Sequence, residues 1–83
     1  MITKKQFISK LNSMLSKYMP VPAADTAISE MEAEKLSEVN DSSPLSEETI
    51  DKNLVVLFSR ISFIKGDITA SEFVTEFNNW RYK

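Results

Sequence analysis

Hydrophobic residues recur every three or four positions along most of this chain, which is the spacing of one face of an α-helix. The pattern is clear in three segments, at about residues 4–18, 47–65 and 70–81. A fourth segment, at 23–39, has a weaker hydrophobic stripe, although most of its residues favour helix. Four amphipathic helices with short connections predict an all-α fold, a small antiparallel four-helix bundle. The chain of 83 residues is expected to form a single domain, 1–83.

Capping residues mark where these helices should begin. Thr3 and Gln6 have the spacing of a capping box, and Thr69 and Glu72 repeat it. Ser46 is a candidate cap for the segment at 47–65, and Asp25 for the weaker segment. The pairs Ile2–Phe7, Leu45–Ile50 and Ile68–Phe73 have the spacing of a hydrophobic staple across the three clearer starts. Two of the connections are expected at 19–22, where prolines should end the first helix, and at 40–44.

The hydrophobic positions also predict which side chains form the core. They are Phe7, Ile8, Leu11, Met14, Leu15 and Tyr18 in the first segment, Ala24, Ala27, Ile28, Met31, Leu36 and Val39 in the second, Ile50, Leu54, Leu57, Ile61 and Ile64 in the third, and Phe73, Val74, Phe77 and Trp80 in the fourth. Val55, Phe58 and Phe63 broaden the stripe of the third segment. A stripe that broad predicts the central and most buried helix.

Composition removes several kinds of chemistry. The chain has no cysteine and no histidine, so a disulfide, a zinc site of the usual ligands and a Ser-His-Asp triad are not expected. It has no glycine-rich phosphate loop. No segment approaches the roughly 18 uninterrupted apolar residues that suggest a membrane span, and no secretory signal is present. We therefore expect a cytoplasmic protein that is not an enzyme, holds no metal or cofactor and makes no membrane contact.

One segment has the pattern of half a calcium site. Residues 66–73, Gly-Asp-Ile-Thr-Ala-Ser-Glu-Phe, match the end of a calcium loop whose last ligand is a bidentate glutamate. Such a loop also needs oxygen ligands at its first, third and fifth positions, which here are Ile61, Phe63 and Lys65. These side chains cannot bind calcium. The segment is instead predicted to be a turn in which Gly66 ends one helix and Thr69 caps the next.

Charge is distributed unevenly along the chain, although its net value is −2. Residues 1–20 hold four lysines and no acid, whereas residues 21–51 hold nine acids and one lysine. Clustered carboxylates steer the association of a basic partner and disfavour acidic ones. The predicted partner-binding residues are Glu30, Glu34, Glu38, Asp41, Glu47 and Glu48. The competing interpretation is a solvated face whose charge is balanced by the basic ends of the same chain.

The basic residues suggest a different use. Lys4, Lys5, Lys10 and Lys17 lie on the first predicted helix, and Arg81-Tyr82-Lys83 end the chain. Nucleic-acid binding requires a contiguous basic stripe, which these short groups provide only weakly. Arginine and tyrosine are also common in protein interfaces, so Arg81 and Tyr82 are predicted to be free to face a partner.

The run from Leu57 to Phe73, followed by Trp80-Arg81, resembles a helix-turn-helix hairpin of small bacteriocin immunity proteins of the colicin D type. The shared pattern is a hydrophobic helix, a Gly-x-Ile-[Thr/Ser]-Ala-x-Glu-Phe turn and an aromatic helix, over about a third of the chain. The resemblance implies an antiparallel four-helix bundle whose acidic surface blocks the basic active site of a nuclease toxin. It assigns no individual inhibitory residue.

The leading functional hypothesis is a non-enzymatic inhibitor of the immunity or antitoxin kind, which binds a basic protein such as a nuclease toxin through its acidic surface. A small regulatory or adaptor protein, of the sort phages encode to act on host machinery, is the first alternative. A nucleic-acid-associated protein that uses the basic first helix is the second.

Overall fold

The capping box at the N-terminus forms as the sequence predicts. Thr3 Oγ1 accepts a hydrogen bond from the Gln6 amide at 3.2 Å, and Gln6 Oε1 accepts one from the Thr3 amide at 2.9 Å. In the computed structural model, which describes residues 1–83, α1 (Lys4–Met14) begins directly after this cap and continues into a 3₁₀ turn, η1 (Leu15–Lys17). The first predicted helix therefore has nearly its expected extent, with a tighter last turn.

Helix α2 (Val21–Glu34) begins earlier than predicted. Pro20 is its N-cap residue and Pro22 lies in its first turn, where a missing amide costs nothing because first-turn amides have no intrahelical acceptor. Asp25 therefore lies inside the helix, and its predicted capping role is wrong. The helix ends at Glu34, short of the predicted residue 39, and residues 35–46 form the connection to the next helix.

Helix α3 (Glu47–Lys65) has the predicted bounds, and Ser46 Oγ caps it by accepting from the Thr49 amide at 3.1 Å. Gly66, with φ of +95°, both ends α3 and precedes α4 (Asp67–Arg81). Because glycine reaches positive φ without steric cost, one residue suffices to redirect the chain. The predicted start at residue 70 is therefore too late. Thr69 lies within α4 and does not cap it.

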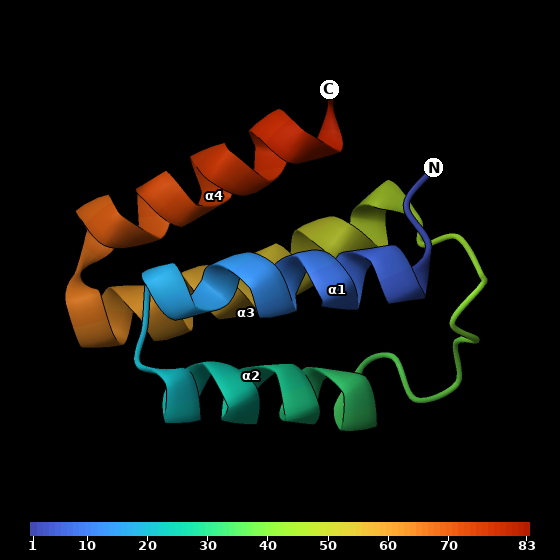
Figure 1. Ribbon diagram of the computed structural model, residues 1–83, viewed down its shortest axis with the longest axis horizontal. Coiled ribbons are helices and arrows are strands. Elements are labelled where there is room, and N and C mark those ends of the chain that lie inside the picture. The colour runs from blue at the N-terminus through green and yellow to red at the C-terminus, as the bar shows by residue number, and fades with distance from the viewer.

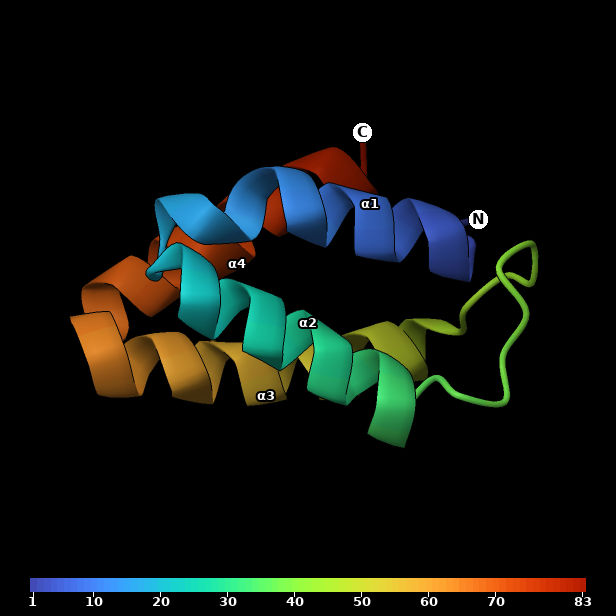
Figure 2. The same ribbon diagram turned by 60° about the horizontal axis from the view of Figure 1, so that its bottom comes forward.

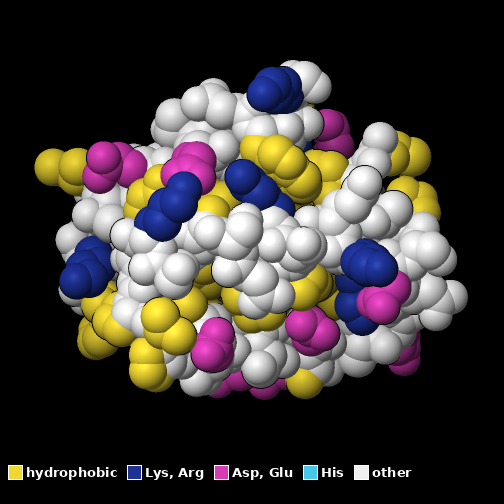
Figure 3. All heavy atoms as spheres, viewed as in Figure 1, with side chains coloured by type: hydrophobic (Ala, Val, Ile, Leu, Met, Phe, Trp, Pro, Cys, Tyr) yellow, Lys and Arg dark blue, Asp and Glu magenta, His cyan; other side chains and the backbone are white.

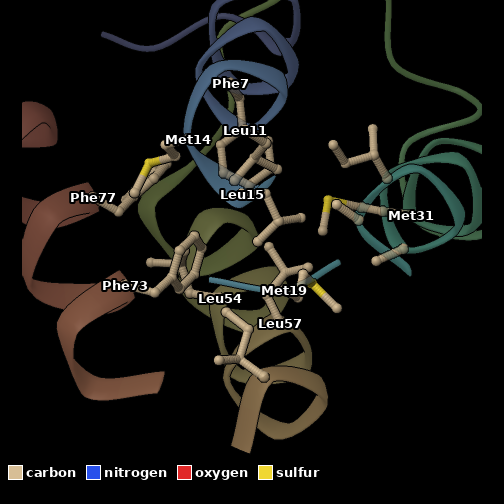
Figure 4. Packing of buried hydrophobic residues seen from close by; sticks show 14 of the residues in the cluster. Phe7, Leu11, Met14, Leu15, Met19, Met31, Leu54, Leu57, Phe73 and Phe77 are labelled. Carbon is tan, nitrogen blue, oxygen red and sulfur yellow. The ribbon is translucent and has the colours of Figure 1, made fainter. Parts of the chain in front are cut away.

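The helices enclose one hydrophobic core (Figure 4). Figure 1 shows α4 returning along α3 after the Gly66 turn, and α2 returning beneath α1. The aromatic rings of Phe7 and Phe77 meet edge to face with centroids 5.6 Å apart, which joins α1 to α4. The Cα radius of gyration is 11.9 Å, close to the value of about 12 Å expected for a compact chain of this length. The chain is thus all-α and compact, without a β-strand.

Most predicted core residues are buried, and the exceptions lie on α3 and at the start of α4. Val55 and Phe63 are 65% and 93% exposed, so they do not broaden a buried stripe. Ile64 is also exposed. Ile68, which was predicted to form a hydrophobic staple with Phe73 at the start of α4, is 81% exposed. Helix α3 therefore turns one side to the core and leaves the opposite side uncovered, contrary to its predicted central position.

Candidate protein-binding surface

The six predicted partner-binding residues lie along a continuous part of the chain, from α2 through the connection 35–46 to the first turn of α3. They are called the acidic surface below and comprise Glu30, Glu34, Glu38, Asp41, Glu47 and Glu48. Figure 1 shows this connection leaving the end of α2 and returning to the start of α3 at the edge of the molecule, beside the N-terminus.

Two members of the acidic surface have partners within the chain. Glu30 pairs with Arg60 across the α2–α3 interface, and both side chains are less than half exposed. Glu48 pairs with Lys52, one turn along α3, at 2.9 Å. An exposed pair of this kind contributes little to stability, so Glu48 can exchange it for another cation at small cost. Glu30 is the less available of the two because it also holds α2 against α3.

The other four members have no ion pair within the chain. Glu34, Glu38, Asp41 and Glu47 are all exposed, and none of them contacts a lysine or arginine within salt-bridge distance. Glu30 and Glu34 lie one turn apart on α2, and like charges at this spacing repel modestly in the free protein. A cation brought to this surface would relieve that repulsion.

The connection that carries Glu38 and Asp41 is fixed to the N-terminal segment by backbone hydrogen bonds. The Lys4 amide donates to Ser43 O and the Lys5 amide to Asp41 O, both at 3.0 Å. The Leu45 amide donates to Ile2 O at 2.8 Å, next to an isolated bridge between Thr3 and Pro44. These contacts link parts of the chain about 40 residues apart and give the connection a defined shape without helix or strand.

Lys4 adds side-chain contacts to the same connection. Its Nζ donates to Leu36 O at 2.9 Å and to Val39 O at 3.0 Å. Leu36 is fully buried and Val39 half-buried, so this lysine holds the first half of the connection over the core. Lys4 is therefore a structural residue, and its charge offsets part of the negative potential of the acidic surface.

Most of the lysines predicted for nucleic-acid binding make contacts with other residues of the same chain. Besides Lys4, Lys17 Nζ lies 3.0 Å from Glu76 Oε2, and Lys10 Nζ lies 5.6 Å from the centre of the Trp80 ring. Figure 3 shows basic and acidic side chains interspersed over the face that carries α1. This distribution does not form the contiguous basic stripe that nucleic-acid binding requires.

Arg81 is not free to face a partner, contrary to the prediction. Its side chain is 4% exposed, and it donates to Asp51 Oδ1 at 2.7 Å and to Glu47 O at 3.3 Å. The guanidinium also lies over the ring of Tyr82, 4.8 Å from its centre. Arg81 thus joins the end of α4 to the start of α3. Tyr82, at 64% exposed, remains accessible.

A second acidic region, which the sequence did not indicate, lies along α4. Tyr18 and the α4 residues Asp67, Glu72 and Glu76 line an open groove of about 600 Å³. Tyr18 donates to Glu76 Oε1, and burial and this hydrogen bond raise the pKa of Tyr18 to about 12. Hydrogen bonds from Tyr18 and Lys17 lower the pKa of Glu76. The groove runs along α4, and only Tyr18 comes from a distant part of the chain, so no local sequence pattern reports its approach to Glu76.

The structure gives no support for metal chemistry at the calcium-like motif. Residues on both sides of Gly66 are helical, so Ile61, Phe63 and Lys65 belong to α3 rather than to a loop. No three histidine, cysteine or acidic side chains are grouped closely enough to hold a metal ion. No helix has the length and apolar character required to cross a membrane.

Comparison of the chain with models of protein families, with curated proteins and with solved structures finds no match.

Proposed function

We propose that this protein is a non-enzymatic inhibitor of the immunity or antitoxin kind, which binds a basic protein such as a nuclease toxin through the acidic surface. In this proposal the chain acts in the cytoplasm as an antiparallel four-helix bundle. The immunity-protein resemblance of the Leu57–Phe73 hairpin supports the same class.

The observation that carries the proposal is the set of unpaired carboxylates. Glu34, Glu38, Asp41 and Glu47 are exposed along one stretch of chain and have no cationic partner within the molecule. The active site of a nuclease is basic because it binds phosphates, and carboxylates can occupy the same positive field. Binding there would exclude the nucleic acid and inhibit the enzyme without chemistry by the inhibitor.

The hydrogen bonds between the N-terminal segment and the connection support this role. A loop that is ordered before binding loses less conformational entropy in the complex, which favours affinity. The carbonyls of Asp41 and Ser43 are already held by the Lys5 and Lys4 amides. The carboxylates of Glu38 and Asp41, two members of the acidic surface, thus lie on a segment that is ordered before binding.

The experiment pairs this chain with the product of the gene next to its own. Both proteins are purified, and binding is measured by surface plasmon resonance at several salt concentrations. We expect the partner to be basic and to have a nuclease activity that this chain inhibits. We also expect the association rate to fall as salt rises, because the Debye length shrinks from about 10 Å at 0.1 M to about 3 Å at 1 M.

Charge reversal identifies the surface. The double variant Glu34→Lys/Glu38→Lys should weaken binding and inhibition by at least about tenfold, since like charges then face the partner. The matched control Glu32→Lys/Glu72→Lys reverses the same number of exposed acids outside the acidic surface and should have a much smaller effect. Equal loss in both variants would indicate net charge alone. Unchanged affinity in the first, with loss on Lys5→Ala/Lys10→Ala, would overturn the proposal in favour of the basic side of α1.

A further inference from the structure

An open hollow lies at the end of the molecule where the N-terminal segment, the start of α3 and the end of α4 meet. Its volume is about 640 Å³, and six of the ten residues that line it are hydrophobic. Leu45 and Ile50, which are almost fully buried, belong to its walls, together with Ile2, Trp80 and Tyr82. A hollow of this size has room for an aromatic or long aliphatic side chain.

The hollow adjoins the acidic surface. Glu47 belongs to both, and Glu48 follows it in the first turn of α3. Figure 2 shows the connection 35–46, drawn in green, at the same end of the molecule as the N-terminus and the start of α3. An exposed carboxylate of the acidic surface, that of Glu47, thus lies at the edge of an apolar hollow.

Glu47 also sets the charge that the hollow presents to another molecule. The other charged side chain in the lining is Arg81, which is 4% exposed and donates to Asp51 Oδ1 at 2.7 Å. The charge of Arg81 is therefore already compensated, whereas the Glu47 carboxylate has no lysine or arginine within salt-bridge distance. The hollow is thus complementary to an apolar group that has a cation beside it.

The aromatic walls are held in place by contacts within the chain. The Trp80 ring meets the Phe77 ring edge to face at 5.5 Å, and Lys10 Nζ lies 5.6 Å from the centre of the Trp80 ring. Tyr82 is 64% exposed, and the Arg81 guanidinium lies 4.8 Å from the centre of its ring. Walls that are fixed before binding lose little conformational entropy in a complex. Tryptophan, tyrosine and arginine are also the residues most enriched among those that dominate interface affinity.

We infer that the basic partner inserts an apolar side chain, with lysine or arginine next to it, into this hollow. This anchor rests on the proposed function, because it belongs to the same interface as the acidic surface. Protein interfaces commonly surround a charge-poor, apolar centre with a polar rim. Charges at the rim mainly set the association rate, whereas a buried anchor slows dissociation. In this arrangement the acidic surface attracts the partner and the hollow retains it.

A tripeptide tests the hollow without the partner. Trp80 is the only tryptophan of the chain, so fluorotryptophan labelling gives a single fluorine NMR signal from the wall of the hollow. The peptide Ac-Lys-Phe-Lys-NH2 should shift this signal saturably, with a dissociation constant between about 1 mM and about 10 mM. Ac-Glu-Phe-Glu-NH2 should bind at least about fivefold more weakly, because its carboxylates meet that of Glu47.

Two variants with matched controls locate the binding site of the tripeptide. Tyr82→Ser should weaken binding of the lysine tripeptide at least about fivefold without lowering the melting temperature, because the side chain is mostly exposed. Phe63→Ser removes another exposed aromatic ring, which does not line the hollow, and should leave binding unchanged. Glu47→Gln should remove the preference for the lysine tripeptide. Glu72→Gln makes the same change of charge on α4 and should preserve that preference.

The product of the neighbouring gene separates this anchor from the proposed function. In surface plasmon resonance, Tyr82→Ser should raise the dissociation rate at least about fivefold at an unchanged association rate, whereas Glu34→Lys/Glu38→Lys lowers the association rate. Weaker binding of the acid variant, with wild-type dissociation of Tyr82→Ser, overturns the anchor and leaves the proposed function in place.

The tripeptide gives the remaining outcomes. The absence of a saturable shift at about 20 mM, or a shift that Tyr82→Ser leaves unchanged, overturns the anchor. A saturable shift that Tyr82→Ser weakens, in a chain that does not bind the gene product, supports the hollow as a site for such a side chain and overturns the proposed function.

Discussion

Tyr18 donates its phenolic hydroxyl to Oε1 of Glu76, a residue 58 positions further along the chain. The contact ties the turn after α1 to the middle of α4, and Lys17 holds the other carboxylate oxygen at 3.0 Å. The rings of Tyr18 and Phe73 also meet edge to face at 5.7 Å, so the phenol is anchored at both its ring and its hydroxyl. The hydrogen bond requires a protonated phenol, and an ionised carboxylate strengthens it.

The pKa values of this pair predict how stability depends on pH. The pKa of Glu76 is lowered in the folded state, so its contribution is present above the unfolded pKa near 4.5 and is lost as the pH falls through the folded value. The pKa of Tyr18 is raised, so its contribution is present below pH 10.0 and is lost as the pH rises toward about 12.

Tyr18→Phe should therefore lower the free energy of unfolding by about 1 kcal/mol at neutral pH and flatten both arms of the pH profile. Urea denaturation between acidic and alkaline pH measures this, with Tyr82→Phe as the control at an exposed tyrosine. Superimposable pH profiles for Tyr18→Phe and the wild type would contradict a structural role for the pair.

Arg81 should be the most sensitive charged residue in the fold. When the buried Arg81 side chain is removed, the Asp51 carboxylate and the Glu47 carbonyl lose the donor that they share. Because Asp51 is still 62% exposed, Arg81→Ala should cost about 2 kcal/mol, less than the loss of a fully buried pair. Lys52→Ala, which breaks the exposed pair with Glu48, should cost less than about 0.5 kcal/mol. Thermal and chemical denaturation compare the two, and equal costs would mean that burial of Arg81 does not matter.

Gly66→Ala isolates the backbone requirement of the turn between α3 and α4. A Cβ at this position would contact nothing within 4 Å, so the cost comes only from the conformation, with φ of +95° and ψ of 166°. Residues other than glycine rarely adopt this region, and we expect a loss of about 2 kcal/mol. Ser62→Ala serves as a neighbouring control, since it removes only an exposed hydroxyl contact. A stable Gly66→Ala variant would imply that the two helices can be joined by another turn geometry.

Two caps that look alike in the sequence should respond differently to mutation. Ser46→Ala removes a side-chain oxygen that accepts from the Thr49 amide and should cost about 1 kcal/mol. Thr69→Ala changes a residue inside α4 and should be nearly neutral or slightly stabilising, because alanine has the higher helix propensity. Calorimetric melting temperatures separate the two cases. A larger loss at Thr69 than at Ser46 would restore the cap that the sequence predicted.

Sequence reasoning succeeded where the determinants are local. The start of α1 and both ends of α3 follow from Thr3, Ser46 and Gly66, whose effects extend only a few residues. It failed at the start of α4 because Gly66 allows Asp67 to begin a helix at once, which leaves Thr69 no amide to cap. It also failed for Phe63, because periodicity shows which residues share a face but not how much of that face a neighbouring helix covers.

The acidic surface could be predicted only in part, since its availability depends on contacts between distant residues. The cluster of carboxylates is visible in the sequence, but the pairing of Glu30 with Arg60 joins residues 30 positions apart. The position of Lys4 under the connection is equally invisible, because it depends on main-chain carbonyls 32 and 35 residues away. The packing of distant residues decides which charges remain unpaired, and the local sequence pattern does not show that packing.

The backbone hydrogen bonds between the N-terminal segment and the connection 35–46 also let two amides in the first turn of α1 report on binding at the connection. The Lys4 and Lys5 amides exchange with solvent only when their bonds to Ser43 O and Asp41 O open. A molecule that grips Glu38 or Asp41 and stiffens the connection will slow deuterium uptake at these two amides, although it need not touch α1. A molecule that pulls the connection away will expose both amides to solvent and speed their deuterium uptake. The exchange of these two amides therefore shows whether a molecule has bound and whether it tightens or loosens the connection.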